Sequence, residues 1–200
     1  MGRVSTARED LINAAAHELW QGSYGSVGVG PLCAAAGVKR GSFYYFFDSK
    51  DDLVLAALEH NWQRLRGPLE DVLGDEATPP LDRLERFFDA IADLHEQERR
   101  SSGRVPGCPF GNLGVELATH NEVIRERVAE IFGRIQARLA AWLRAARANR
   151  TIELDEARVE DRAEQLFGCL QGAQVLAKTY ADPDAIRRLA PAALAIARAP

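Results

Sequence analysis

Apolar residues recur every three or four positions along almost the whole chain of 200 residues. In the segment that contains Leu11, Ile12, Ala15 and Leu19, this spacing places the apolar side chains on one face of a helix. No segment shows the strict alternation of apolar and polar residues that is typical of a half-buried strand. The sequence therefore predicts an all-α protein of about nine helices.

Several polar residues have the spacing of helix N-terminal caps. A Ser or Thr with an acidic residue three positions on predicts a capping box, and Asp before Pro or Glu predicts a cap and first turn. The predicted caps are Thr6, Ser49, Asp155 and Asp182. Stretches rich in helix breakers at residues 74–80 and 99–109 are predicted as loops.

The composition is that of an ordinary globular protein, with 46% hydrophobic and 27% charged residues. With 25 Lys and Arg against 29 Asp and Glu, the net charge of −4 does not fit a polycation that coats nucleic acid. No apolar run approaches the roughly 18 residues of a membrane span, and no signal-peptide pattern is seen. We therefore expect a cytoplasmic protein without a membrane partner.

The residues that could carry catalysis or bind metal form no familiar constellation. Cys33, Cys108 and Cys169 are far apart and lack disulfide or zinc spacing, so we expect reduced thiols. Glu116 and His120 are four residues apart, half of a possible metal site, but no second half is visible. Since no phosphate loop, metalloprotease motif or nucleophile elbow occurs either, we predict no metal, no cofactor and no enzymatic activity.

Residues 27–53 read VGVGPLCAAAGVKRGSFYYFFDSKDDL and have the dimensions of a helix-turn-helix unit. On a helix that begins near Arg40, Phe43 and Phe47 share one side. Gly41, Ser42 and Tyr45 point to the other side, where hydroxyl groups reach bases or phosphates. A short aromatic helix is often simply core, but the polar start of this one favours contact with nucleic acid.

Residues 35–53, AAGVKRGSFYYFFDSKDDL, closely resemble the recognition region of the TetR/AcrR family of bacterial repressors. The shared elements are A-G-V, a small residue before an aromatic or aliphatic residue and Tyr, and F-x-S-K-x-x-L. The resemblance covers about residues 6–58. One departure is the VGVGP stretch at residues 27–31, where the family often has a Ser or Thr that caps the second helix.

The resemblance implies a helix-turn-helix DNA-binding domain at residues 1–48 and a helical effector-binding and dimerisation domain at residues 49–200. It implies a ligand-responsive homodimer that binds a palindromic double-stranded DNA operator as a repressor and is released by a small-molecule effector. The DNA contacts that it implies are Lys39, Arg40, Gly41, Ser42, Tyr44, Tyr45 and Lys50.

Two further groups of residues follow from the resemblance together with the helix pattern. The candidate effector contacts are mostly aromatic: Trp62, Phe87, Phe88, Ile91, Cys108, Phe110, Asn112, Glu116, Phe132 and Trp142. The candidate dimer contacts lie on the last two predicted helices: Leu166, Leu170, Gly172, Ala173, Leu176, Leu189, Ala193 and Ile196.

Two alternatives remain open at this point. The chain could be an all-α small-molecule carrier or enzyme whose N-terminal helices serve packing only. It could also be a sensor of oxidants or electrophiles that acts through Cys108, which lies in PGCPFGN at a predicted helix start.

Overall fold

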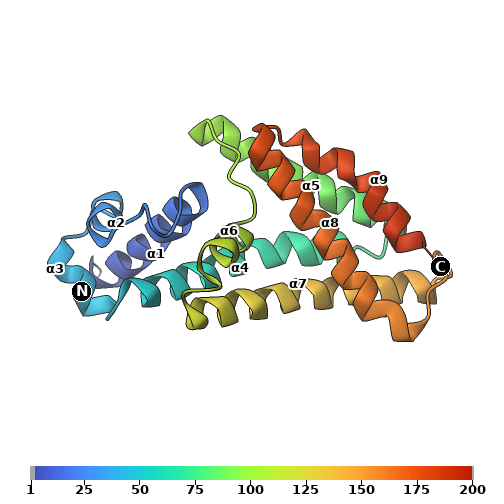
Figure 1. Cartoon of the computed structure of the whole chain (residues 1–200), viewed down its shortest axis with the longest axis horizontal. Coiled ribbons are helices and arrows are strands. Elements are labelled where there is room, and N and C mark those ends of the chain that lie inside the picture. Colours follow the sequence, from blue (N-terminus) through green and yellow to red (C-terminus); the bar gives the residue numbers. More distant parts are fainter. Residues whose placement is uncertain (1–2, 200) are drawn as a thin grey trace. The chain divides into compact units, whose positions relative to one another are not determined.

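The computed structural model describes residues 3–199, without the side chains of residues 3–5 and 68. This part of the chain contains nine α-helices and no strand, so the predicted all-α fold is confirmed (Figure 1). The helices are α1 (Arg3–Gln21), α2 (Val29–Ala35), α3 (Arg40–Phe46), α4 (Lys50–Gly74), α5 (Pro80–Ser102), α6 (Pro109–Leu117), α7 (Glu122–Ala148), α8 (Val159–Tyr180) and α9 (Asp184–Arg198). A 3-10 turn, η1 (Glu156–Arg158), precedes α8.

The described residues form two compact units. The head unit contains the residues up to Arg64 together with Pro109–Glu130, and the body unit contains Leu65–Cys108 and the residues from Ile131 onward. Helices α4 and α7 each contribute to both units. The head unit thus includes α6 besides the three N-terminal helices, while the functional division after residue 48 stays a prediction.

Three of the four predicted caps are confirmed. The Ser49 hydroxyl accepts the Asp52 N–H at 3.1 Å, and the Asp52 carboxylate accepts the Ser49 N–H at 2.9 Å. This reciprocal pair is a capping box, and it opens α4. Asp155 and Asp182 each accept a backbone N–H two residues on, at 3.1 and 3.0 Å, ahead of α8 and α9.

Two predicted helix boundaries are wrong. Helix α1 already includes Arg3, so Thr6 lies inside the helix and does not cap it. Helix α5 continues into the predicted loop and ends only where Gly103 adopts a left-handed φ of 74°. Ion pairs of 2.7 and 2.8 Å from Glu96 to the arginines three and four residues on favour the helical conformation of these last turns.

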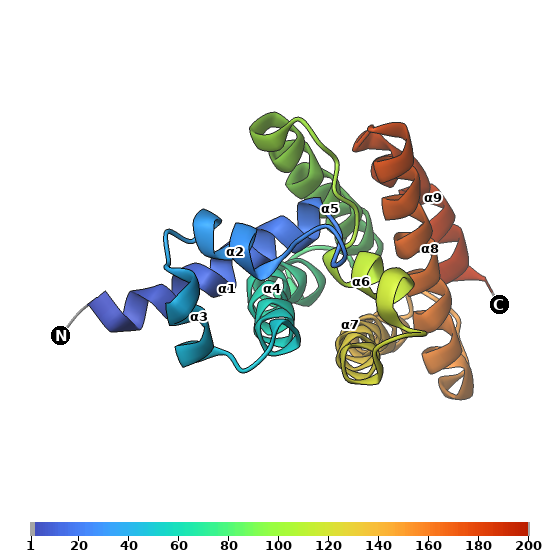
Figure 2. The same cartoon turned by 60° about the vertical axis from the view of Figure 1, so that its left-hand side comes forward.

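In the head unit, α1, α2 and α3 gather beside the first turns of α4 (Figures 1 and 2). Helices α2 and α3 have only seven residues each, too few to be stable as isolated helices. Leu11, Leu32, Phe43 and Leu53 are fully buried in the shared core. The two short helices therefore depend on packing against α1 and α4 for their position.

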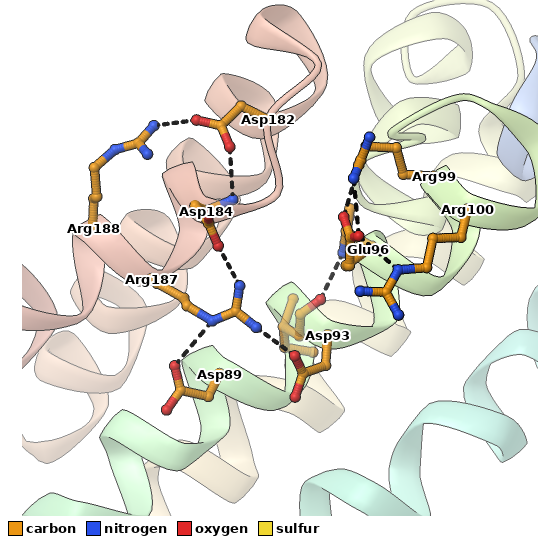
Figure 3. A network of polar contacts seen from close by, with 11 residues as sticks. Asp89, Asp93, Glu96, Arg99, Arg100, Asp182, Asp184, Arg187 and Arg188 are labelled. Carbon is orange, nitrogen blue, oxygen red and sulfur yellow. Dashed lines mark hydrogen bonds and ion pairs between the residues drawn. The ribbon is translucent and has the colours of Figure 1, made fainter.

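In the body unit, α9 packs against both α8 and α5. Figure 3 shows Arg187 of α9 between two acidic residues of α5, Asp89 at 3.4 Å and Asp93, and it also pairs with Asp184. These ion pairs are largely exposed and contribute little energy. Their main effect is to fix the position of α9 along α5, and they add little to the stability of the body unit.

Candidate functional sites

The α2–α3 segment has the geometry of a helix-turn-helix. Gly28 stands at the N-cap of α2 without a side-chain hydrogen bond, as its lack of a hydroxyl requires. The turn between the helices depends on Gly37, whose φ of 65° lies in the left-handed region. The Val38 N–H then donates to the Cys33 carbonyl at 2.8 Å, which closes the end of α2.

Helix α3 divides into a buried and an exposed face, as the sequence predicts. Phe43 on this helix and Phe47 just after it are buried against the rest of the head unit. Tyr44 is 59% and Tyr45 77% exposed, so both phenol groups are available to a partner. A Cβ at Gly41 would find no atom within 4 Å, so this position faces open space. A flat, hydroxyl-bearing face of this kind fits a major groove.

The exposed tyrosines are held by neighbouring aromatic rings. Tyr44 packs edge-on against Phe43 with ring centroids 5.1 Å apart, and Tyr45 packs edge-on against Phe46 at 5.0 Å. Because these contacts restrict the tyrosine rotamers, less conformational entropy is lost when the hydroxyls bind a partner.

Three cations lie near the two ends of α3. Lys39 and Arg40 are exposed at the start of α3, as the sequence predicts. Arg8 of α1, which the sequence reasoning missed, lies at the other end, with its guanidinium 5.3 Å from the centroid of the Phe47 ring. No sequence signal relates Arg8 to α3, because the two are brought together only by the packing of α1.

Lys50, also predicted as a DNA contact, makes internal contacts within the head unit. Its ammonium group donates to the Tyr24 carbonyl at 2.5 Å and lies 3.7 Å from the centroid of the Tyr24 ring. Burial lowers the pKa of Lys50, while the charges of Asp51 and Glu116 act in the opposite direction. The bond to Tyr24 uses one of the three ammonium N–H groups and Lys50 is partly exposed, so its contact with DNA stays a prediction.

The candidate effector residues are divided between the two units. Trp62, Phe110, Asn112 and Glu116 belong to the head unit. The body unit holds the others, Phe87, Phe88, Ile91, Cys108, Phe132 and Trp142. The ten candidate effector residues therefore do not all belong to one compact unit.

The side chains of two of these residues form hydrogen bonds with backbone groups of their own unit. The Glu116 carboxylate accepts the backbone N–H groups of Tyr24 and Gly25, at 2.8 Å each, and its contact with an effector stays a prediction. The indole N–H of Trp142, in the core of the body unit, donates to the Pro80 carbonyl at 2.9 Å. It serves to join α7 to α5.

A smaller group in the body unit combines aromatic, amide and thiol side chains. Phe132 of α7 packs edge-on against Phe167 of α8, with ring centroids 4.8 Å apart. One turn further along α8, the Gln171 amide donates to the Cys108 sulfur at 3.5 Å. Phe167 and Gln171 were not among the predicted effector residues, although their spacing of four places them on one face of α8.

The candidate dimer contacts include residues that face inward. Leu166, Leu170, Ala173 and Ala193 are buried within the single chain, so these four predictions are corrected: the residues belong to the core of the body unit. The other four, Gly172, Leu176, Leu189 and Ile196, remain wholly or partly accessible. Beside them, Gly168 and Gly172 each face open space, and Val175 is 60% exposed.

The structure shows neither a metal-binding cluster nor a membrane-spanning helix among its described residues. Within residues 3–199, no three His, Cys, Asp or Glu side chains are grouped closely enough to hold a metal ion. Glu116 and His120 do not share a helix face, because α6 ends at Leu117. None of the described helices is both long and apolar enough to cross a bilayer.

Known families match both parts of the chain. A model described as bacterial regulatory proteins of the tetR family matches residues 11–57, which run from α1 into α4. A model described as the tetracyclin repressor-like C-terminal domain matches residues 80–193, which run from α5 into α9.

Two relatives are similar in sequence. The transcriptional regulator AcuR of Cereibacter sphaeroides is 32% identical over 181 residues, which cover 90% of this chain and 80% of AcuR. The HTH-type transcriptional repressor DhaR of a Mycobacterium species is 30% identical over 125 residues, which cover 62% of this chain and 59% of DhaR.

Solved structures share the fold. A regulatory protein TetR from Rhodobacter sphaeroides matches with a TM-score of 0.84 at 29% identity, covering 95% of this chain and 98% of that one. NemR of E. coli in its reduced form matches with a TM-score of 0.81 at 22% identity, covering 94% of each chain. At the latter identity the similarity concerns the fold alone.

Proposed function

Because the chain belongs to the TetR family of bacterial transcriptional regulators, we propose that it is a dimeric repressor that a small molecule releases from a palindromic operator. The observation that carries this proposal is the exposed face of α3, with two ordered tyrosines over a buried Phe43. The relative DhaR is called a repressor, which supports repression as the sign of regulation. Since the operator is chromosomal DNA, we place the protein in the cytoplasm.

The DNA contacts that we propose fall into two classes. Gly41, Ser42, Tyr44 and Tyr45 form the face that enters the major groove and reads base edges. Lys39 and Arg40 at the start of α3, and Arg8 near its end, neutralise phosphates. The first class determines sequence preference, and the second determines salt dependence.

The dimer that we propose is formed by α8 and α9 of two chains. Gly168 and Gly172 lack side chains on an exposed face, so a partner helix approaches closely there. Val175 and the partly exposed Leu176, Leu189 and Ile196 supply apolar surface around them. Two-fold symmetry of the protein then requires a palindromic operator.

We propose that the effector binds in the body unit, near the Phe132–Phe167 pair and Gln171. This combination favours a small, largely apolar molecule with a polar group that meets the amide. Effector and operator must weaken the binding of each other by the same factor, because both act on one equilibrium. We propose that the effector is bound and not turned over, which separates this function from the alternative of an enzyme or carrier.

A thiol-based sensor is the second candidate function, and the Gln171 hydrogen bond to the Cys108 sulfur favours it. A donor directed at sulfur stabilises the thiolate, which is the reactive form. Treatment with N-ethylmaleimide should then release the protein from DNA, and Cys108→Ser should abolish this release. Cys169→Ser is the matched control, because burial raises the pKa of the Cys169 thiol and makes it less reactive. Release that persists in Cys108→Ser contradicts this function.

The proposed repressor is tested by selecting duplexes from a randomised DNA pool with the purified, dimeric protein. We expect enrichment of one palindromic sequence whose binding resists competitor DNA and weakens as salt rises. The upstream DNA of its own gene, assayed by gel shift at two salt concentrations, is the first natural sequence to compare. A well-folded dimer that enriches no sequence contradicts the proposal and favours the carrier or enzyme alternative.

A further inference from the structure

We propose that Glu116 of α6 is a positioning residue for DNA binding, although it lies outside the helix-turn-helix. It acts through a polar clasp, which we define as Tyr24, Gly25, Lys50, Asp51, Glu116 and Asn121. All six residues belong to the head unit. The inference rests on the proposed reading of DNA by α3.

Glu116 holds the turn that leads into α2. One oxygen of its carboxylate accepts the Tyr24 N–H at 2.8 Å, and the other accepts the Gly25 N–H at 2.8 Å. Two consecutive amides on one carboxylate form charge-assisted bonds with a fixed direction. Hydrogen bonds between Ser23 and Ser26 close the same turn on itself, so the carboxylate fixes an already folded turn to α6.

The same turn is bonded to the first turn of α4. The Tyr24 hydroxyl donates to one oxygen of Asp51 at 2.6 Å, and the Lys50 ammonium donates to the Tyr24 carbonyl at 2.5 Å. Burial and the bond to Asp51 raise the pKa of Tyr24 to about 12, so its hydroxyl stays protonated and donating. The turn before α2 and the start of α4 are therefore held together.

Asn121, just before α7, completes the clasp from the other side. Its amide nitrogen donates to the second oxygen of Asp51 at 2.8 Å, and its side-chain oxygen accepts the Ile124 N–H at 3.1 Å. The loop after α6 is thereby fixed to α4. The C-terminal end of α6 and the loop that follows it thus contact residues that flank the reading helices, α2 and α3.

These contacts bracket the reading helices in the chain. Tyr24 and Gly25 precede α2, whereas Lys50 and Asp51 follow α3 by only a few residues. Helices α2 and α3 are too short to hold their own position, so restraint at both flanks determines how α3 is presented. Loss of Glu116 should therefore misplace the reading face without removing a single DNA contact.

The test compares Glu116→Ala with Glu126→Ala in fluorescence anisotropy on the selected operator. Glu126 is 64% exposed and pairs with Arg125, so both variants remove one negative charge from the head unit. Charge alone predicts that both variants bind the DNA polyanion slightly more tightly. We expect Glu116→Ala to bind about tenfold more weakly and Glu126→Ala to bind as the wild type does or better.

The salt dependence separates positioning from direct contact. The slope of the logarithm of affinity against the logarithm of salt should stay unchanged in Glu116→Ala, because no phosphate contact is lost. In Lys39→Ala the slope should decrease by about 0.9. A decrease of the slope in Glu116→Ala, or operator affinity equal to that of Glu126→Ala, overturns the proposal.

Amide hydrogen exchange tests the clasp without any operator. In Glu116→Ala we expect faster exchange in residues 24–46, and no change in α8 and α9 of the same protein. Faster exchange throughout the chain, with a lower melting temperature and unchanged affinity of the folded fraction, would show a merely structural role. If the wild type selects no operator, the proposed function fails, while the exchange data still decide whether Glu116 positions α2 and α3.

Discussion

Arg162 of α8 offers the sharpest test of how the body unit is stabilised. Its side chain is only 2% exposed, the largest of the fully buried side chains in the described residues. One terminal nitrogen, Nη1, donates to the Ile196 carbonyl at 2.5 Å and to the Ala199 carbonyl at 2.6 Å. These carbonyls lie at the C-terminal end of α9, where a cation is favoured by the helix dipole.

We predict that Arg162→Met destabilises the protein by about 2 kcal/mol. Two bonds from a charged donor contribute roughly 1.5–3 kcal/mol each, and the cost of burying the guanidinium offsets part of this. Methionine fills a similar volume, so the loss reports the hydrogen bonds and not a cavity. For a chain of this size, about 2 kcal/mol lowers the melting temperature by roughly 4–8 °C.

The measurement is urea unfolding followed by circular dichroism, with Arg100→Met as the matched control. Arg100 is 76% exposed and pairs with Glu96, so its replacement should change the free energy of unfolding by less than about 0.5 kcal/mol. Equal stability of the two variants would refute the reasoning. It would mean that the desolvation of Arg162 cancels the bonds that it donates.

Three further predictions concern pH, assembly and DNA. Burial lowers the pKa of His95 below its ordinary value of 6.5. As the pH falls, His95 therefore becomes protonated in the unfolded state at a higher pH than in the folded state. The free energy of unfolding should therefore fall as the pH drops below about 6.5, and urea titrations of His95→Gln should show a flatter pH dependence. Val175→Glu should convert the dimer to monomer in sedimentation experiments, whereas Val115→Glu, at a position 91% exposed on α6, should leave the dimer intact. Tyr45→Ala should weaken binding of the selected operator by about 1–3 kcal/mol in anisotropy titrations, with little effect on random duplex.

Most of the fold was predictable because its signals are local. Apolar spacing gave the helices, and the Ser49 pair gave the start of α4, since a capping box involves residues only three positions apart. The two faces of α3 followed from the rotation per residue, which places Phe43 opposite Tyr45. Each of these features is decided within one or two helical turns.

Features that depend on distant partners were not predictable in this way. Glu116 bonds amides 91 and 92 positions away, and nothing in its own helix distinguishes that role from contact with a ligand. Lys50 follows a family motif, yet its ammonium group binds the Tyr24 carbonyl. In both cases the sequence identified an important polar residue but not the group that it meets.

The dimer prediction illustrates a different limit. Helix α8 packs against α9 within one chain, and Leu170 and Ala173 are buried in that chain, while Gly172 and Val175 point outward. Apolar and small residues thus occupy nearly the whole circumference of the helix, so periodicity alone cannot divide an internal face from an intermolecular one. Only the burial of each side chain in the structure separates the two faces of α8. The exposed face contains Gly168 and Gly172, where we propose the dimer interface. A bulky residue at Gly172 should therefore disrupt the dimer, whereas truncation of Leu170 should first destabilise the single chain.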